Sequence, residues 1–288
     1  MLTPDILQRC MPRAPRAACE TWAAPLWAAA VEFGQDEPNR LAAALASIAN
    51  ESGQLTVFEE ASYINTDYDY AYNQVFGARM PPRDVWEGWK TGGRKHFDQC
   101  MYNWLYDDRR PGNPKLGNVN DGDGYNRRGL GPLQITGGGN LKAASKACGV
   151  DFYANPDLLL DPVQGSRAAM AYLKINGITD PAVDGSERGF LESVRRSNPG
   201  LPQKTFREHH LQRWHEVRRG LGITGGGVDV AAMQRALMAA GFDLPQYGAD
   251  GDLGLETRTA LQRFQRARGL PITGSPDSAT VKALGIAA

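Results

Sequence analysis

The sequence has little of what marks a metalloprotein or a disulfide-rich secreted scaffold. Its 288 residues include only four cysteines and four histidines. The cysteines, at positions 10, 19, 100 and 148, form no CxxC pair, and no HExxH or similar spacing joins a histidine to acidic residues. Such sparse cysteines are typical of a chain made in a reducing compartment. Without ligand spacings, we expect neither a metal site nor a cofactor.

An excess of charge of either sign is also missing. Lysine and arginine total 32, as do aspartate and glutamate, so the formal net charge is zero. We therefore expect no broad electrostatic binding of nucleic acid or of an anionic bilayer. The segment 187–219 is an exception, with eight basic residues against four glutamates. A solvated helical face explains such an excess more often than a polyanion site does.

Long apolar runs are absent too. No run approaches the roughly 18 residues needed to cross a bilayer, so we expect no membrane insertion. Basic residues precede the Ala- and Trp-rich stretch 21–31, but Pro25 interrupts it, and Trp22, Leu26 and Phe33 recur at helical spacing. This pattern favours a core-facing helix over a signal peptide.

Helical periodicity is what the chain does have. Apolar spacing with Gly and Pro punctuation predicts helices at 17–33, 39–52, 94–106, 140–148, 161–175, 187–197 and 205–219. Strand signals are few and short. The stretch 107–140 is too rich in Gly, Asn, Asp and Pro for regular structure, and long loops in compact domains are usually functional. The prediction is a mainly α fold with long loops.

A glycine-rich segment divides the chain. "GLGITGGGVDV" at 220–230 predicts a flexible linker over 223–227, between a first domain at 1–222 and a tail domain at 228–288. The tail contains "MQRALMAAGF", "DGDLG" at 250–254, "TRTALQRFQRARGL" at 257–270 and "SPDSATVKAL" at 275–284. In this order the motifs resemble the peptidoglycan-binding domain type 1 family, a small three-helix module. The resemblance implies binding to bacterial peptidoglycan, and the residues of its pattern are chiefly structural.

Two glutamates in "IANESGQLTVFEEASY", residues 48 to 63, raise a catalytic hypothesis. Glu51 precedes Glu60 by nine positions, which on an unbroken helix would place them on opposite faces. Gly53 accepts a left-handed cap, so we predict that the helix ends here and that Glu60 folds back to face Glu51 across a groove. From spacing alone, two ordinary surface glutamates remain the alternative.

The two environments predict different protonation. Glu51 lies in the last turn of its helix, where the dipole raises the pKa of a carboxyl, which suits a general acid. Glu60, on a polar loop beside Glu59, is expected to stay ionised and to activate water. An inverting glycosidase needs such a pair about 6.5 to 9.5 Å apart.

The stretch "DGYNRRGLGPLQITGGGN" at 123–140 carries a second resemblance, together with "LASIANESG", "FGAR" at 76–79 and "NPDLL" at 155–159. In this order the motifs resemble glycoside hydrolase family 19, in particular its short phage endolysins, which have a lysozyme-like, bilobal helical fold. The resemblance implies that Glu51 is the catalytic acid and Glu60 the base, with Glu59 as an alternative base.

Further roles follow from the same resemblance. Thr136 matches the hydroxyl residue that holds the nucleophilic water, Gln134 and Asn140 match side chains that bind the sugar, and Asn198 matches an asparagine on the other wall. Among the aromatic residues, Tyr125 is the one expected to contact substrate. The chain departs from the family pattern at three positions. Asn50 occupies a position where the family usually has His, Leu130 one where Arg is common, and Leu141 one where Tyr is common. These differences bear on substrate preference.

Together the resemblances predict a monomeric endolysin that hydrolyses the β-1,4 bond between N-acetylmuramic acid and N-acetylglucosamine with inversion. A chitinase, an interbacterial wall-degrading effector and a non-catalytic wall-binding virion protein are the alternatives. Without a signal peptide, the protein is expected to accumulate in the host cytoplasm and to act on the periplasmic cell wall after a membrane lesion.

Overall fold

The computed structural model describes residues 1–198, 203–223, 230–251, 255–274, 276 and 278–286. Residues 224–227 of the predicted linker and 252–254 of the predicted "DGDLG" turn lie outside the described residues. The chain divides into two compact units. The first combines Met1–Pro4, Arg13–Phe33 and Ile48–Ile175, and the second combines Asp5–Pro12, Gly34–Ser47 and Asn176–Ala288. Both units draw on residues 1–222, and the predicted domain boundaries stay predictions.

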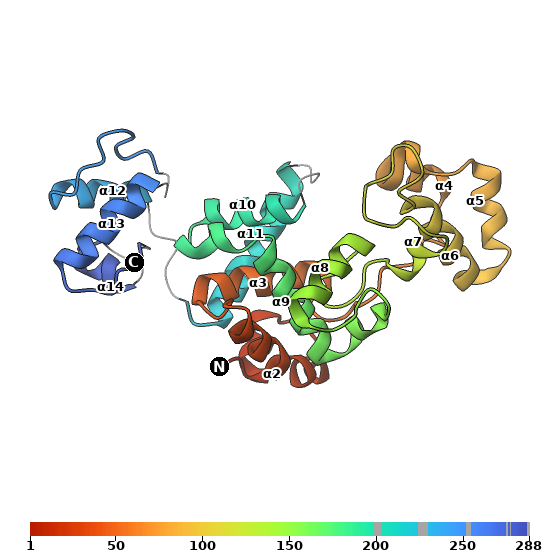
Figure 1. Cartoon of the computed structure of the whole chain (residues 1–288), viewed down its shortest axis with the longest axis horizontal. Helices are drawn as coiled ribbons and strands as arrows, with labels where there is room; N and C mark the ends of the chain where they lie inside the picture. The colour runs from red at the N-terminus through yellow and green to blue at the C-terminus, as the bar shows by residue number, and fades with distance from the viewer. Residues whose placement is uncertain (199–202, 224–229, 252–254, 275, 277, 287–288) are drawn as a thin grey trace. The chain divides into compact units, whose positions relative to one another are not determined.

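The first unit is built from helices and short helical turns (Figure 1). They are α2 (Arg16–Glu32), α4 (Tyr68–Tyr70), η1 (Ala71–Phe76), η2 (Gly77–Arg79), α5 (Arg83–Lys90), α6 (Gly93–Leu105), α7 (Asp123–Asn126), α8 (Gly138–Cys148), η3 (Pro156–Leu160) and α9 (Pro162–Ile175). The helix α3 (Pro38–Glu51) begins among residues of the second unit and ends in the first.

The second unit is helical as well. It contains α1 (Pro4–Cys10, all but its first residue), η4 (Asp180–Asp184), α10 (Glu187–Ser197), α11 (Gln203–Gly220), α12 (Val230–Ala239), α13 (Leu255–Ala267) and α14 (Ser278–Ala283). Every helix predicted from apolar periodicity is present, with ends within two residues of the prediction. Over the described residues, β-structure is limited to isolated bridges, so the mainly α prediction is confirmed. None of the described helices is long and apolar enough to span a membrane.

The core of the first unit forms where α2 packs against α9. Trp22 and Leu26 lie on the buried face of α2, and the helix continues through Pro25. Trp22 also stacks on Phe58, with ring centroids 4.7 Å apart and ring planes 8° from parallel. This stacking anchors the segment that leads into Glu59 and Glu60.

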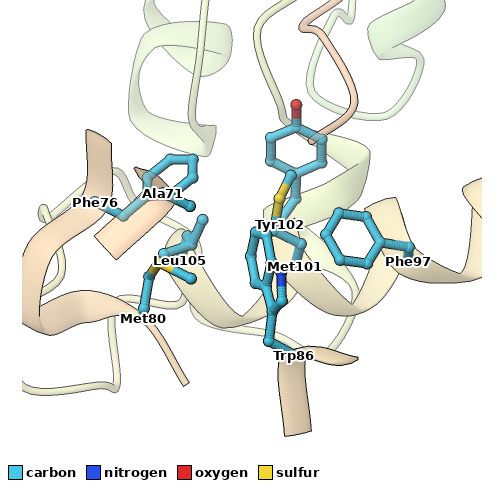
Figure 2. Close-up of a cluster of buried hydrophobic side chains, with 8 residues drawn as sticks. All are labelled: Ala71, Phe76, Met80, Trp86, Phe97, Met101, Tyr102 and Leu105. Atoms are coloured by element: carbon cyan, nitrogen blue, oxygen red, sulfur yellow. The ribbon is translucent and has the colours of Figure 1, made fainter. Parts of the chain in front are cut away.

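A second cluster of buried side chains lies between η1 and α6 (Figure 2). Its members are Ala71, Phe76, Met80, Trp86, Phe97, Met101, Tyr102 and Leu105. Trp86 meets Phe97 edge to face, with centroids 4.7 Å apart. The Tyr102 hydroxyl donates a 2.6 Å hydrogen bond to the carbonyl oxygen of Ala61, one residue after Glu60. The second cluster therefore fixes the backbone just after Glu60, as the Trp22–Phe58 stacking fixes the backbone just before it.

The helices α12, α13 and α14 have a core of their own. Met233, Leu237, Leu261 and Phe264 are fully buried in it. Gln234 is buried beneath this core, where its amide nitrogen donates to Asp250 and Thr257 and its oxygen accepts from the Gly251 N–H. A second buried glutamine repeats the arrangement: Gln265 donates to Thr273 and Thr280 and accepts from the Gly274 N–H. These residues of the tail pattern are therefore structural.

Candidate active site

The predicted helix break is present. Helix α3 ends at Glu51, and Gly53, Gln54 and Leu55 follow with φ of 56°, 62° and 60°. The left-handed region costs a non-glycine residue roughly 1–2 kcal/mol. Buried Ser52 supports the turn, because its hydroxyl donates to the Ile48 carbonyl at 2.6 Å and accepts from the Leu55 N–H at 2.9 Å. The chain therefore reverses directly after Glu51.

After the turn, Glu60 pairs with the loop that contains Gly129. The Glu60 N–H donates to the Gly129 carbonyl oxygen at 2.9 Å, and the Gly129 N–H donates to Glu60 Oε2 at 2.9 Å. The Tyr106 hydroxyl donates to Glu60 Oε1 at 2.6 Å. Each carboxylate oxygen thus has its own donor, an arrangement that fixes the carboxyl group and favours its charged form.

Burial has the larger effect on the pKa of Glu60. Loss of water raises this pKa, and the hydrogen bonds from Tyr106 and Gly129 and the charge of Arg128 only partly offset the rise. Glu60 therefore lacks the solvated surroundings expected of a polar loop, and its ionised state stays a prediction. The loop packs against residues 128–131 instead of extending into solvent, which makes Glu60 a stronger base than a surface glutamate.

The pKa of Glu51 is raised, as predicted, but for another reason. The side chain keeps contact with solvent, yet the surrounding protein removes enough water to raise the pKa by desolvation. The prediction had assigned this rise to the helix dipole. Burial raises the pKa of the Tyr172 hydroxyl on α9, and the negative charge of nearby Glu51 adds to this rise. That Glu51 and Glu60 face each other stays a prediction.

Glu59, the alternative base, has a different environment. Its side chain is 53% exposed and pairs with Arg128, which is 10% exposed. Its backbone forms an antiparallel bridge with Leu130, and Leu130 bridges to Ile135. Glu59 therefore holds the Arg128 loop in place and its carboxylate is already occupied by a cation, whereas Glu60 is bound to Gly129.

The predicted side chains converge on Gly129. A Cβ atom on this residue would lie 2.9 Å from Gln134 Oε1, 3.3 Å from Thr136 Oγ1 and 3.4 Å from Glu60 Oε2. Three residues singled out from the sequence therefore surround one point on the backbone. The space there is available because Gly129 has no side chain.

Local hydrogen bonds fix the positions of Gln134, Thr136 and Asn140. Gln134 has φ of 51°, a sparsely populated value of the kind often found at functional sites. Its Nε2 donates to the Gly131 carbonyl at 3.1 Å, and the Thr136 hydroxyl donates to the Gln134 carbonyl at 3.0 Å. Asn140, in the first turn of α8, donates from Nδ2 to the Thr136 carbonyl at 2.8 Å. Asn140 is thus joined to Thr136, as a shared site requires.

Two residues predicted to contact substrate, Tyr125 and Asn198, are not among the side chains that surround Gly129. Tyr125 is half-buried against the second cluster of the first unit, and the Arg128 guanidinium lies 4.3 Å from the centre of its ring. One ring face is therefore already covered. Asn198 caps the C-terminal end of α10, in the second unit, and is exposed. Substrate contact by either residue stays a prediction.

Sequence reasoning missed three residues of this arrangement: Tyr106, Arg128 and Gly129. Tyr106 follows the last residue of α6, where its spacing carries no chemical signal. Arg128 and Gly129 stand in the quoted motif, but their role depends on contacts with residues 59 and 60, which are 69 positions away.

Comparison with known proteins identifies the tail. Residues 226–284 match the family model described as "Putative peptidoglycan binding domain". A 58-residue segment is 47% identical to N-acetylmuramoyl-L-alanine amidase CwlL of Bacillus licheniformis, covering 20% of this chain and 16% of that protein. A 39-residue segment is 49% identical to the type VI secretion system spike protein VgrG3 of Vibrio cholerae, covering 14% and 4%. The chain thus spans under a fifth of the length of these relatives.

Solved structures are similar to a larger part of the chain. A bacterial family 19 chitinase is similar with a TM-score of 0.51 and 19% identity, covering 78% of this chain and 97% of that one. Chitinase C from Streptomyces griseus HUT6037 has a TM-score of 0.50 and 18% identity, covering 78% of each chain. The chain therefore combines the lysozyme-like fold of family 19 chitinases with a peptidoglycan-binding domain at residues 226–284.

Proposed function

We propose that this protein is a glycoside hydrolase of the bacterial cell wall that cuts the β-1,4 bond between N-acetylmuramic acid and N-acetylglucosamine with inversion. The observation that carries the proposal is the convergence of Glu60, Thr136 and Gln134 on Gly129. A buried carboxylate beside a hydroxyl can orient one water molecule, and an amide can bind an N-acetyl or hydroxyl group of a sugar. The fold likeness to family 19 chitinases supports the same reaction class.

In this mechanism, Glu60 Oε2 and Thr136 Oγ1 hold a water molecule on one face of the sugar ring. As water attacks the anomeric carbon, Glu60 takes its proton. Glu51 donates a proton to the glycosidic oxygen, which leaves as a hydroxyl group. The product has the opposite anomeric configuration, and proton exchange with solvent returns Glu51 to the acid form and Glu60 to the carboxylate.

The two carboxyls have environments suited to these opposite roles. Burial raises the pKa of Glu51, which favours its protonated form. Contacts from Tyr106, Gly129 and Arg128 favour the ionised form of Glu60 against its own burial. A pair of titratable groups in contrasting environments is the usual basis for assigning an acid and a base.

Peptidoglycan is the proposed substrate because of the domain at 226–284. A wall-binding domain keeps the catalytic domain at a high effective concentration near an insoluble polymer. The formal net charge of zero makes such specific anchoring more useful, since electrostatic attraction to the wall is weak. Chitin is the second candidate, favoured by the chitinases among the structural neighbours.

Digestion of purified peptidoglycan and colloidal chitin in parallel tests the proposal. Mass spectrometry of the fragments should find N-acetylmuramic acid at the new reducing ends. N-acetylglucosamine at those ends would assign a different bond, and turnover of chitin without turnover of peptidoglycan would contradict the substrate assignment. The Glu51→Gln variant should bind walls without lysing them, whereas unchanged lysis would eliminate Glu51 as the acid.

As the biological role, we propose a monomeric phage endolysin, made in the host cytoplasm, that reaches the periplasmic wall through a membrane lesion. An interbacterial effector is the alternative, and the short likeness to a type VI secretion spike protein favours it. A neighbouring holin gene would support the first role, and a neighbouring immunity gene the second.

A further inference from the structure

A pocket of about 360 Å³ lies on α5, α6 and the loop after α6, within the first unit. None of the predicted site residues lines it. From α6 and the residues that follow, Cys100, Asn103, Trp104 and Asp107 line the pocket; their spacing places them along one stripe of a helix. Tyr102 projects from about the opposite side of α6 and reaches Ala61, so the pocket and Glu60 lie on different sides of this helix.

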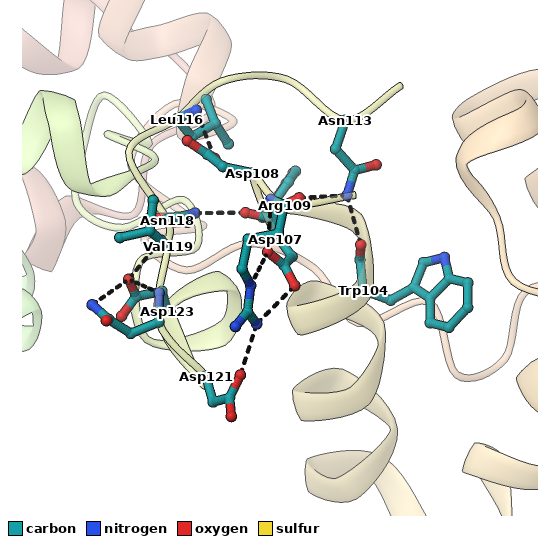
Figure 3. A network of polar contacts seen from close by, with 12 residues as sticks. Trp104, Asp107, Asp108, Arg109, Asn113, Leu116, Asn118, Val119, Asp121 and Asp123 are labelled. Atoms are coloured by element: carbon teal, nitrogen blue, oxygen red, sulfur yellow. Dashed lines mark hydrogen bonds and ion pairs between the residues drawn. The ribbon is translucent and has the colours of Figure 1, made fainter. Parts of the chain in front are cut away.

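Two neighbouring arginines of the pocket differ in how their charge is compensated. Arg109 donates to both carboxylate oxygens of Asp107, at 2.8 and 2.9 Å, and to Asp121 at 2.7 Å. Figure 3 shows this network, with the ring of Trp104 directed away from it. Arg109 therefore binds both Asp107 and Asp121, and Arg109 and Arg110 together balance the formal charge of these two carboxylates.

Arg110 has no such partner. Its guanidinium carbon lies 3.5 Å from the centre of the Trp104 ring. Within the described residues, its side chain forms no hydrogen bond or ion pair, and its Nε is buried without a partner. A half-buried guanidinium is a planar fork of donors that matches a carboxylate. The pocket thus holds one cation whose hydrogen-bonding capacity is unused.

The walls of the pocket suit a ligand with flat, partly apolar surfaces. Trp89 and Trp104 form one wall, with ring centroids 5.8 Å apart and ring planes at 61°. Gly122, at φ of 84°, lies on another wall, where a Cβ atom would meet only the Asn126 side chain, at 3.5 Å. The volume lies within the range of small-molecule sites. An acyl or peptide group could lie against the indoles with its carboxylate at Arg110.

We propose that this pocket is a second wall-binding site, which takes a carboxylate of the peptide stem of peptidoglycan at Arg110. The inference rests on the proposed function for its source of ligand, because peptide stems carry carboxylates and chitin carries none. A site of this kind would favour peptidoglycan over chitin independently of the domain at 226–284. Binding of a neutral sugar in the same pocket is the competing outcome.

Cys100 provides a reporter inside the pocket. Its thiol is partly accessible, whereas Cys10, Cys19 and Cys148 are buried. Burial raises the pKa of the Cys100 thiol, so alkylation is measured at mildly alkaline pH, where more thiolate is present.

The experiment follows the rate of Cys100 alkylation by iodoacetamide in the full chain, by peptide mass spectrometry. Three ligands are compared: a muramyl peptide with free carboxylates, the same compound with its carboxylates amidated, and the dimer of N-acetylglucosamine.

The free-acid muramyl peptide should slow alkylation, and the amidated form should need about tenfold higher concentration for equal protection, as expected for the loss of a charged hydrogen-bonded pair. Arg110→Gln should lose the preference for the free acid, and Arg110→Lys, which keeps the charge without the fork, should keep part of it. The control is Arg94→Gln, on α6 outside the pocket with a 73% exposed side chain, which should behave like the parent protein.

Equal protection by the amidated peptide or the neutral dimer would overturn the assignment of a carboxylate site, as would no protection by any ligand. Melting temperatures separate these outcomes from unfolding of a variant. The muramyl peptide contains no glycosidic bond between sugars, so its binding does not depend on hydrolysis. If the protein lyses walls but no ligand protects Cys100, carboxylate binding in the pocket is refuted and the proposed function stands. If the muramyl peptide protects Cys100 but the protein does not lyse walls, the proposed function is refuted and carboxylate binding in the pocket stands.

Discussion

The Tyr106 hydroxyl donates a 2.6 Å hydrogen bond to Glu60 Oε1, across 46 positions of sequence. The pKa of this hydroxyl is raised by burial and by the charge of Glu60, so Tyr106 keeps its proton wherever Glu60 is ionised. Since its hydrogen bond favours the ionised carboxylate, Tyr106 lowers a pKa that burial raises. Tyr106 therefore sets the lower end of the pH range in which Glu60 can act as a base.

Tyr106→Phe removes this donor and leaves the ring in place. Glu60 should then hold its proton to higher pH, because one of the contacts that stabilises its charge is lost. The acidic limb of the pH profile of kcat/KM on peptidoglycan should shift to higher pH. We expect about a 10- to 100-fold loss at the optimum, since a hydrogen bond to a charged group contributes roughly 1.5–3 kcal/mol. An unchanged acidic limb would contradict the assignment of Glu60 as the base.

Glu51→Gln should reduce activity and increase stability. Burial raises the pKa of Glu51 in the folded state, so the folded protein binds this proton more tightly than the unfolded chain does. The resulting stabilisation is complete below the unfolded pKa and is lost as pH rises through the folded pKa. Above the folded pKa, where the wild-type carboxyl has lost this stabilisation, the neutral glutamine should raise the melting temperature. The rate should fall about 10²- to 10⁴-fold, as for loss of a general acid.

Melting curves of the two proteins across pH check the sign of this effect. The difference in melting temperature should shrink as pH falls and Glu51 becomes protonated in the wild type. Glu20→Gln is the control because Glu20 and its partner Arg16 are both largely exposed, with side chains 58% and 52% exposed. A Glu51→Gln variant whose melting temperature does not rise relative to the wild type as pH increases would refute the view that desolvation of this carboxyl is costly.

Local pattern was sufficient to predict the helices but not the site. The helices α2, α3, α6 and α8 to α11 begin and end close to their predicted positions because apolar periodicity and Gly or Pro punctuation act within one element. The helix α5 was missed. It has eight residues, its one buried side chain is Trp86, and Gly88 lies inside it, so it is shorter than the window of 11 to 18 residues over which an apolar period is read.

The contacts of Glu60 could not be predicted from the sequence for a different reason. Its partners Tyr106 and Gly129 lie 46 and 69 positions away, and no local pattern encodes pairing at such separations. The burial of Glu60 depends on these contacts, so the rise of its pKa could not be predicted from the residues next to it in sequence. The site residues themselves were named through a family resemblance.

Thr136→Ala tests the role of the hydroxyl. The hydroxyl donates to the Gln134 carbonyl and lies with Glu60 around Gly129. If it positions the water, its loss should lower kcat by about 10²-fold or less, because positioning contributes without making or breaking a bond. KM and wall binding should change little. Thr136→Ser, which keeps the hydroxyl, should recover most of the rate, and failure of that recovery would assign Thr136 to packing.

Gln234→Ala tests whether the tail domain anchors the protein. The buried amide of Gln234 pairs with Asp250, Thr257 and Gly251, so its loss removes three hydrogen bonds, at a cost of roughly 1–3 kcal/mol. Pelleting with insoluble walls should weaken, while hydrolysis of soluble peptidoglycan fragments should be retained. Thr259→Ala, which removes an exposed hydroxyl of α13, is the control. Full wall binding by an unfolded tail would contradict the anchoring role.

Gly129→Ala is the most direct test of the geometry. The added methyl would lie 2.9 Å from Gln134 Oε1 and 3.3 Å from Thr136 Oγ1, in the space proposed for water. Gly129 does not have positive φ, so alanine causes no backbone strain there. We therefore expect a loss of about 10²-fold or more in kcat, as for a small displacement of reacting groups, with a change of only a few degrees in melting temperature. Gly88→Ala, where nothing lies near the new methyl, is the control and should keep full activity. Near-normal activity in Gly129→Ala would mean that the reacting water does not occupy this space, and the roles of Glu60 and Thr136 would have to be assigned elsewhere.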